Sequence, residues 1–214
     1  MRKGTDDRLD GRRERSRRTR RAIVVAATDL FVSDGYGSTT ITAIADRAGV
    51  SVQTVYASFG TKRAILAEAL DQAIAGDDEV IVVNAREWMR EVWEAPTGVE
   101  RLAAYAAAVR RIVTNAGDLY NVVTTAASTD PEVVALASTA EVRRRAGAAS
   151  VVGSVTEVAA LRRGLTTDEA IDVLWTLNSP AVYHLLVRRA GWDLDRYERW
   201  LAEAFVRELL EAER

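Results

Sequence analysis

Cysteine is absent from the 214-residue sequence, and histidine occurs once, at His184. The lack of cysteine excludes disulfides and thiolate metal sites, and it suits a reducing cytoplasm. A lone histidine, with no His/Glu pair at metal-ligand spacing, leaves little for metal or acid–base catalysis, and packing is its usual role. The sequence "GYGS" at residues 35–38 is too short for a phosphate-binding loop. We therefore expect no catalytic residues, no metal and no cofactor, and predict that the protein is not an enzyme.

Long hydrophobic runs are also missing. No uncharged apolar run approaches the roughly 18 residues that a membrane-spanning helix needs, and the longest candidate, residues 173–187, contains Asn178, Pro180 and His184. Arginines precede the apolar run at residues 22–27, as they would in an export signal. That run is shorter than the core of about 7 to 15 residues that a signal requires. We expect a cytoplasmic protein with no membrane partner.

Lysine is scarce, with two residues against 27 arginines, and the cations gather at one end of the chain. Residues 1–66 carry 13 basic and 7 acidic side chains, whereas residues 67–214 carry 16 basic and 24 acidic ones. This asymmetry indicates a cationic, partner-binding end joined to an acidic body. Charge alone fits a solvated arginine arm without a partner equally well.

Strand patterns are nearly absent, and the helical periodicity predicts an all-α fold of about nine helices. Residues 1–16 lack periodicity and are expected to form a flexible basic arm. Helices then follow from residue 17 to Gly35, after a cap at Thr39, after Ser51 and after Thr61. Further helices are predicted at 78–94, 98–115, 118–128, 131–151, 168–190 and 194–212. Capping boxes at Thr97/Glu100 and Thr166/Glu169, and Asp130 before Pro131, mark three of their starts.

Residues 39–59 have the spacing of a helix-turn-helix. A small Ala45 permits a close crossing of two helices, Gly49 makes the turn, and Val55 fixes the second helix against the first. The side chains left facing outward are short or carry an amide, as suits a helix in a major groove about 12 Å wide. They are Ser51, Gln53, Thr54, Ala57 and Ser58. An ordinary helical hairpin with a polar face shows the same spacing.

The longer segment "TTITAIADRAGVSVQTVYASFGTKRAIL" resembles the DNA-binding head of the TetR family of transcriptional regulators. The resemblance is strong over residues 20–70, and "LWTLNSPAVYHLLVRRAGW" is similar to the penultimate helix of many such regulators. The matching positions are Thr39, Thr40, Ile44, Ala45, Ala48, Gly49, Val50, Ser51, Thr54, Tyr56, Phe59 and Lys62. This implies a helix-turn-helix head at 17–70 and a helical ligand-binding and dimerisation domain at 71–214.

The resemblance also implies which residues touch double-stranded DNA. Thr40, Tyr56 and Lys62 would hold phosphates, and Lys62 stands where the start of a helix adds partial positive charge. Ser51, Gln53, Thr54 and Ser58 would face base edges. Many members have glycine in place of Gln53 and histidine in place of Ser58, so the operator cannot be borrowed from a relative. Gln53 either contacts an adenine through two hydrogen bonds or blocks the close backbone approach that glycine permits.

In the body, the resemblance implies a pocket for a largely apolar small molecule and a four-helix bundle between two subunits. Candidate pocket residues are Trp88, Tyr105, Tyr120, Trp175 and Asn178. Candidate homodimer contacts are Leu185, Trp200, Leu201 and Phe205. For the aromatic residues, packing inside the core is the simpler interpretation, and both apolar stripes of the last two helices could equally pack within one chain.

The function implied is a repressor that binds a near-palindromic operator as a homodimer and is released by a small-molecule effector. The arginines of the arm either reach phosphates or a minor groove, or form a solvated tail. They are Arg12, Arg13, Arg15, Arg17 and Arg18. A different hypothesis is a helical interaction or membrane-surface protein that uses this arm. Its binding would depend on the arginines and not on Gln53 or Thr54.

Overall fold

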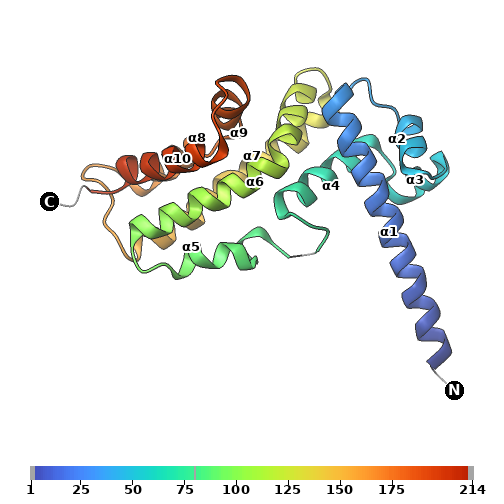
Figure 1. The fold of residues 1–214 in the computed structure, drawn as a ribbon, viewed down its shortest axis with the longest axis horizontal. Coiled ribbons are helices and arrows are strands. Elements are labelled where there is room, and N and C mark those ends of the chain that lie inside the picture. The colour runs from blue at the N-terminus through green and yellow to red at the C-terminus, as the bar shows by residue number, and fades with distance from the viewer. Residues whose placement is uncertain (1–2, 80, 212–214) are drawn as a thin grey trace.

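The computed structural model describes residues 3–79 and 81–211, and an all-α fold is confirmed. Figure 1 shows a head of α1–α3 at one end, a body of α5–α10 at the other, and α4 running between them. Residues 1 and 2 of the expected arm, residue 80 of the helix predicted at 78–94, and residue 212 of the last predicted helix lie outside the described residues. The division of the chain near residue 70 stays a prediction.

The head and the linking helix consist of α1 (Lys3–Asp34), α2 (Ile41–Ala48), α3 (Val52–Phe59) and α4 (Lys62–Ala75). Two short 3-10 turns, η1 (Val83–Ala85) and η2 (Glu87–Met89), lead into the body. The body consists of α5 (Arg90–Glu94), α6 (Gly98–Ala127), α7 (Pro131–Thr156), α8 (Thr167–Leu177), α9 (Pro180–Tyr183), the π-helical turn η3 (His184–Arg189) and α10 (Leu194–Leu209).

Helix α1 begins at Lys3, and the expected start near residue 17 is wrong. The extension projects away from the rest of the molecule in Figure 1. Its arginines and glutamates are good helix formers, and Arg17 lies 3.5 Å from Glu14 one turn earlier. Local propensity therefore continues the helix, and residues 14–18 are exposed. The side chains of Arg12 and Arg13 lie outside the described residues.

The head is held by apolar residues of α1, α2 and α4. Phe31, Ile44 and Leu66 have no solvent exposure and belong to one cluster. The cap of α2 is Thr40 and not Thr39 as expected, because the Thr40 hydroxyl accepts the Ala43 N–H at 3.0 Å. Thr39 is buried instead, and its hydroxyl donates to carbonyls at the end of α1 and in the turn that follows. The close contact between α1 and α2 thus fixes how the helix-turn-helix sits on α1.

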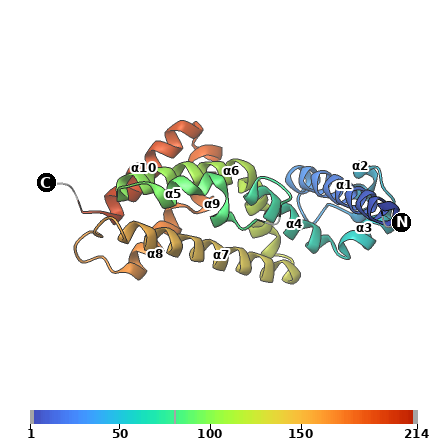
Figure 2. The ribbon, with the colours of Figure 1, turned by 90° about the horizontal axis from the view of Figure 1, so that it is seen from below.

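Helix α6 is the long central helix of the body, where two helices had been predicted at 98–115 and 118–128. Gly117 does not end it. A Cβ atom at Gly117 would lie 2.6 Å from Tyr183 Cε1, so this glycine permits close packing of α9 on α6. In Figure 2, α7 and α8 run along one side of the body and α10 lies over the other. The capping boxes of α6 and α8 and the Asp130 cap of α7 are confirmed.

The helix predicted at 78–94 forms only as the 3-10 turns η1 and η2 and the short helix α5. Arg86 is buried there, with 6% of its surface exposed. Its guanidinium donates to the Ile81 and Glu79 carbonyls and to the Asp77 carboxylate. These hydrogen bonds replace those that a helix would make at the two carbonyls. The resulting loop, residues 77–84, forms one wall of the cavity described below.

The helix predicted at 168–190 is also interrupted. It stops at Asn178 and restarts at Pro180, whose ring cannot donate a backbone hydrogen bond. The restart is a single α-turn that continues as the π-helical η3. This break brings the Asn178 side chain into the body, where it is 5% exposed.

Candidate nucleic-acid interface and ligand cavity

The turn between α2 and α3 has the geometry that its sequence predicts. Gly49 adopts φ +67°, the left-handed region that favours glycine, and the Val50 N–H donates to the Ala45 carbonyl at 3.0 Å. Ala45 and Val55, on either side of the turn, are each 1% exposed and belong to the same apolar cluster. The turn therefore fixes which face of α3 remains outside.

The outward face of α3 is polar and organised at its first turn. Ser51 caps the helix by accepting the Thr54 N–H at 3.1 Å, and the two hydroxyls lie 2.8 Å apart. Gln53 is exposed, and Tyr56 is 53% exposed although it is aromatic. Ser58 is half-buried and donates to the Thr54 carbonyl at 2.8 Å. Thus Ser51, Gln53 and Tyr56 are accessible, whereas Thr54 and Ser58 are partly covered.

Two further predicted DNA contacts flank α3. Thr40 is exposed at the start of α2. The Lys62 ammonium donates to the Tyr36 carbonyl at 2.7 Å and to the Thr39 carbonyl at 2.9 Å, and it lies 4.2 Å from the centre of the Tyr36 ring. Burial lowers the pKa of Lys62 below its usual value. Lys62 therefore braces the loop between α1 and α2, a role that the sequence did not indicate.

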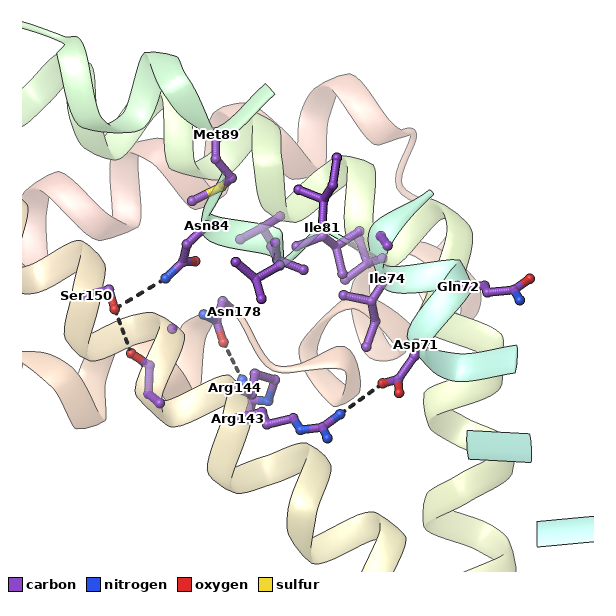
Figure 3. A pocket seen from close by; sticks show the side chains of 18 of the residues that line it. Asp71, Gln72, Ile74, Ile81, Asn84, Met89, Arg143, Arg144, Ser150 and Asn178 are labelled. Atoms are coloured by element: carbon purple, nitrogen blue, oxygen red, sulfur yellow. Dashed lines mark hydrogen bonds and ion pairs between the residues drawn. The ribbon is translucent and has the colours of Figure 1, made fainter. Parts of the chain in front are cut away.

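A cavity of about 910 Å³ lies between α4, α6, α7 and the loop 77–84. Figure 3 draws side chains that line it, and those labelled include Ile74 of α4, Arg144 of α7 and Ile81 of the loop. Its apolar lining is Ile74, Ala75, Ile81, Val82, Val83, Met89, Val109, Ile112, Val113 and Val151. Tyr105 and Tyr120 both line it and stand fifteen positions apart on α6, so the cavity follows the helix for roughly 22 Å. The shape suits an elongated apolar molecule.

One end of the cavity carries a buried polar network. The Asn178 amide donates to the Tyr105 hydroxyl at 2.6 Å, and burial raises the pKa of Tyr105 to about 12. Arg144 donates to the Asn178 side-chain oxygen, to the Trp175 carbonyl at 2.6 Å and to Glu141 at 2.9 Å. Because the Tyr105 hydroxyl accepts from Asn178, its own proton is available to a ligand.

The opposite wall is acidic and contributes Glu68 and Asp71 of α4 and three carboxylates of the loop that follows. Asp71 pairs with Arg143 of α7 at 3.0 Å across the cavity, as Figure 3 shows. Burial raises the pKa of Asp71 above its usual value. Arg143 and Arg144, the first two of three consecutive arginines in α7, were not predicted as cavity residues. Such a triplet among small and apolar residues is the signal that could have found them.

Three of the five predicted pocket residues, Tyr105, Tyr120 and Asn178, line the cavity. Trp88 and Trp175 do not line it. The Arg111 guanidinium lies 5.4 Å from the centre of the Trp88 ring, and the Trp175 indole donates to Glu141 at 3.1 Å. For these two aromatics, packing around the site is the observed role.

The predicted dimer contacts divide into two groups. Leu201 and Phe205 have no solvent exposure because the apolar stripe of α10 packs on α6 and α8 of the same chain, so they offer no surface to a second subunit in this conformation. Leu185 is 54% exposed in η3, and Trp200 is half-buried against Trp192 and Tyr197. Only Leu185 and Trp200 of the predicted four present surface to a partner.

The described part of the chain contains no cluster of three His, Asp or Glu residues able to hold a metal ion. Within the same residues, no helix combines the length and apolar character needed to cross a bilayer.

Residues 23–69 match the family model of bacterial regulatory proteins of the tetR family. A search of curated proteins finds no match to the chain. Among solved structures, NalD of Pseudomonas aeruginosa, the secondary repressor of the MexAB-OprM multidrug efflux pump, is 21% identical with a TM-score of 0.70. The match covers 92% of this chain and 100% of NalD.

Two other solved structures are similar over nearly their whole length. A protein from Saccharomonospora viridis, described as a transcriptional regulator and bound to choline, is 21% identical over 90% of this chain and 98% of its own, with a TM-score of 0.69. The fatty acid degradation regulator FadR from Bacillus halodurans is 16% identical over 87% and 93%, with a TM-score of 0.68. At these identities the likeness shows a shared fold.

Proposed function

We propose that residues 23–69 form the DNA-binding head of a TetR-family transcriptional regulator, and that the protein is a repressor released from its operator by a small molecule. The observation that carries this proposal is the exposed polar face of α3, set out by the left-handed Gly49 turn. Gln53 and Ser51 on this face reach base edges, while Thr40, Tyr56 and Lys62 reach phosphates.

The proposal of repression rests on similarity to NalD. The proposal of a dimer rests on the small contact that a single recognition helix makes with DNA. NalD, which shares the fold, is a repressor. A single helix in one major groove gives little selectivity, and regulators of this kind read two half-sites as dimers. We place the dimer contact on the outer surface of η3 and α10, through Leu185 and Trp200, because the inner stripe of α10 is already covered.

The effector is proposed to be an elongated and largely apolar molecule with one polar group that accepts a hydrogen bond from the Tyr105 hydroxyl. The long apolar lining between Tyr105 and Tyr120 supports this. The Saccharomonospora viridis protein, which has this fold, holds choline in its complex. A ligand that fits one arrangement of the heads better than another shifts the population and changes DNA affinity.

The experiment that tests DNA recognition is selection of bound sequences from random double-stranded DNA. We expect an inverted repeat. Gln53→Ala should then relax the preference at one position of each half-site, by about 1–3 kcal/mol of discrimination. The matched control is Thr139→Ala, which removes an exposed hydroxyl from α7 in the body and should leave the selected sequence unchanged. Recovery of no preferred sequence, or of the same preference without Gln53, would contradict the proposal.

A further inference from the structure

Arg20 of α1 contacts the recognition helix and the linking helix at the same time. Its NH1 atom donates to the Ser58 carbonyl near the end of α3 at 2.6 Å, and its guanidinium carbon lies 4.0 Å above the centre of the Phe59 ring. Its other two nitrogens donate to the two carboxylate oxygens of Glu68 in α4, at 3.3 and 2.9 Å. Such a fork fixes both the distance and the orientation between its partners.

Glu68 is also a wall of the cavity. It contributes to the lining of the cavity, as do Asp71, Gln72 and Ile74 of the same helix. The Gln72 amide donates to Glu68 at 3.0 Å, and the Arg20 hydrogen bonds lower the pKa of Glu68 below its usual value. The carboxylate is therefore ionised at neutral pH and held from both sides. A ligand that displaces the cavity side of α4 must move this carboxylate.

We propose that the Arg20–Glu68 pair transmits occupancy of the cavity to the end of the recognition helix. The inference rests on the proposed function, because it takes the cavity as the effector site. Displacement of Glu68 pulls Arg20, and Arg20 releases or re-aims the Ser58 carbonyl and the Phe59 ring. Arg20 and Glu68 act as positioning residues, since neither has to touch DNA. A second route exists through the direct chain connection from α3 to α4, and the experiment separates the two.

The cavity can be filled without a known effector. Gly147 of α7 lines the cavity, and a Cβ atom there meets nothing within 4 Å, so Gly147→Trp places an indole in the space opposite α4. Gly147→Ala is the matched control because it changes the backbone preference without filling the space. Ser150→Trp, on the same wall, is a second filling variant in case the first does not fold.

The measurement is hydrogen–deuterium exchange of the α3 amides in the full-length protein. We expect Gly147→Trp to accelerate their exchange about five-fold over Gly147→Ala, the low end of typical coupling because the pair is partly exposed. In a Glu68→Gln background, which keeps the shape and removes the ion pair, the acceleration should disappear. In an Asp71→Asn background it should persist, because Asp71 belongs to the same helix and cavity but pairs with Arg143.

The outcomes test this relay, the transmission through the Arg20–Glu68 pair, separately from the proposed function. Equal acceleration in the parent protein and in the Glu68→Gln background would overturn the relay and favour the direct chain connection. No acceleration by either filling variant would overturn it as well. The exchange measurement needs no operator, so it decides the relay even if sequence selection fails. Conversely, a selected inverted repeat sustains the proposed function whatever the exchange shows.

Discussion

Replacement of Lys62 by methionine distinguishes bracing of the head from binding of phosphate. Methionine keeps most of the apolar stem and removes the ammonium that donates to the Tyr36 and Thr39 carbonyls. Hydrogen bonds from charged groups contribute about 1.5–3 kcal/mol each, and each bond of this half-buried pair is expected to contribute less than that, about 1 kcal/mol. The cation–π contact with Tyr36 adds about 0.5 kcal/mol. The free energy of unfolding should therefore fall by about 2–3 kcal/mol.

Urea unfolding followed by circular dichroism measures this loss. The matched control is Arg63→Met, which removes a cation from the same turn of α4 without removing any hydrogen bond found in the described part of the chain. It should change the free energy of unfolding by less than about 0.5 kcal/mol, as exposed substitutions usually do. DNA affinity is then compared across salt concentrations under conditions where both variants remain folded.

Two results would refute the bracing role. One is an unfolding midpoint for Lys62→Met equal to that of the parent protein. The other is a loss of stability matched by Arg63→Met. If Lys62 also holds a phosphate, the slope of log affinity against log salt should decrease by about 0.9. A change in slope without a change in stability would leave phosphate binding as the whole role of Lys62.

Gly49→Ala forces a side chain into the left-handed region and should cost about 1–2 kcal/mol in urea unfolding; an unchanged midpoint would contradict the turn. Gly117→Ala should cost about 1–3 kcal/mol because its Cβ meets Tyr183, whereas Gly147→Ala should add about 0.5–1 kcal/mol of stability in the same assay. The lowered pKa of Glu68 means that its contribution is present above its unfolded pKa and is lost as pH falls through its folded pKa. The stability difference between the parent and Glu68→Gln should therefore shrink below about pH 4, and a difference independent of pH would refute the ion pair.

The head was predictable because the interactions that define it are short in sequence. Gly49 signals its own backbone conformation, and Ser51 and Thr61 cap helices through N–H groups three residues away. The same locality explains the confirmed capping boxes. The exposed positions of α3 then follow from the buried Val55 by helical periodicity. None of these steps needs knowledge of the distant chain.

The errors lie where distant residues decide the outcome. Gly117 was predicted to end a helix, but it lies inside α6, where the absence of a side chain makes room for the ring of Tyr183, far along the chain. Arg86 reads as an exposed helical cation, but it is buried and binds the carbonyls that a helix would have used. The phosphate contact of Lys62 stays a prediction, but the sequence did not indicate that its ammonium also donates to carbonyls of a loop more than twenty residues earlier.

The apolar stripe of α10 shows what periodicity does and does not determine. Tyr197, Leu201, Ala204, Phe205 and Leu209 recur at helical spacing and are all fully buried. The spacing predicts one apolar face on the helix. Once helices of the same chain pack on that face, a second subunit cannot pack on it. Because α6 and α8 of the same chain cover it, the proposed dimer contact is expected on residues outside this stripe. Trp200 is the large α10 residue that remains partly exposed next to the stripe, and Leu185 of η3 is exposed as well. The dimer surface is therefore expected on exposed apolar residues outside the periodic stripe of α10.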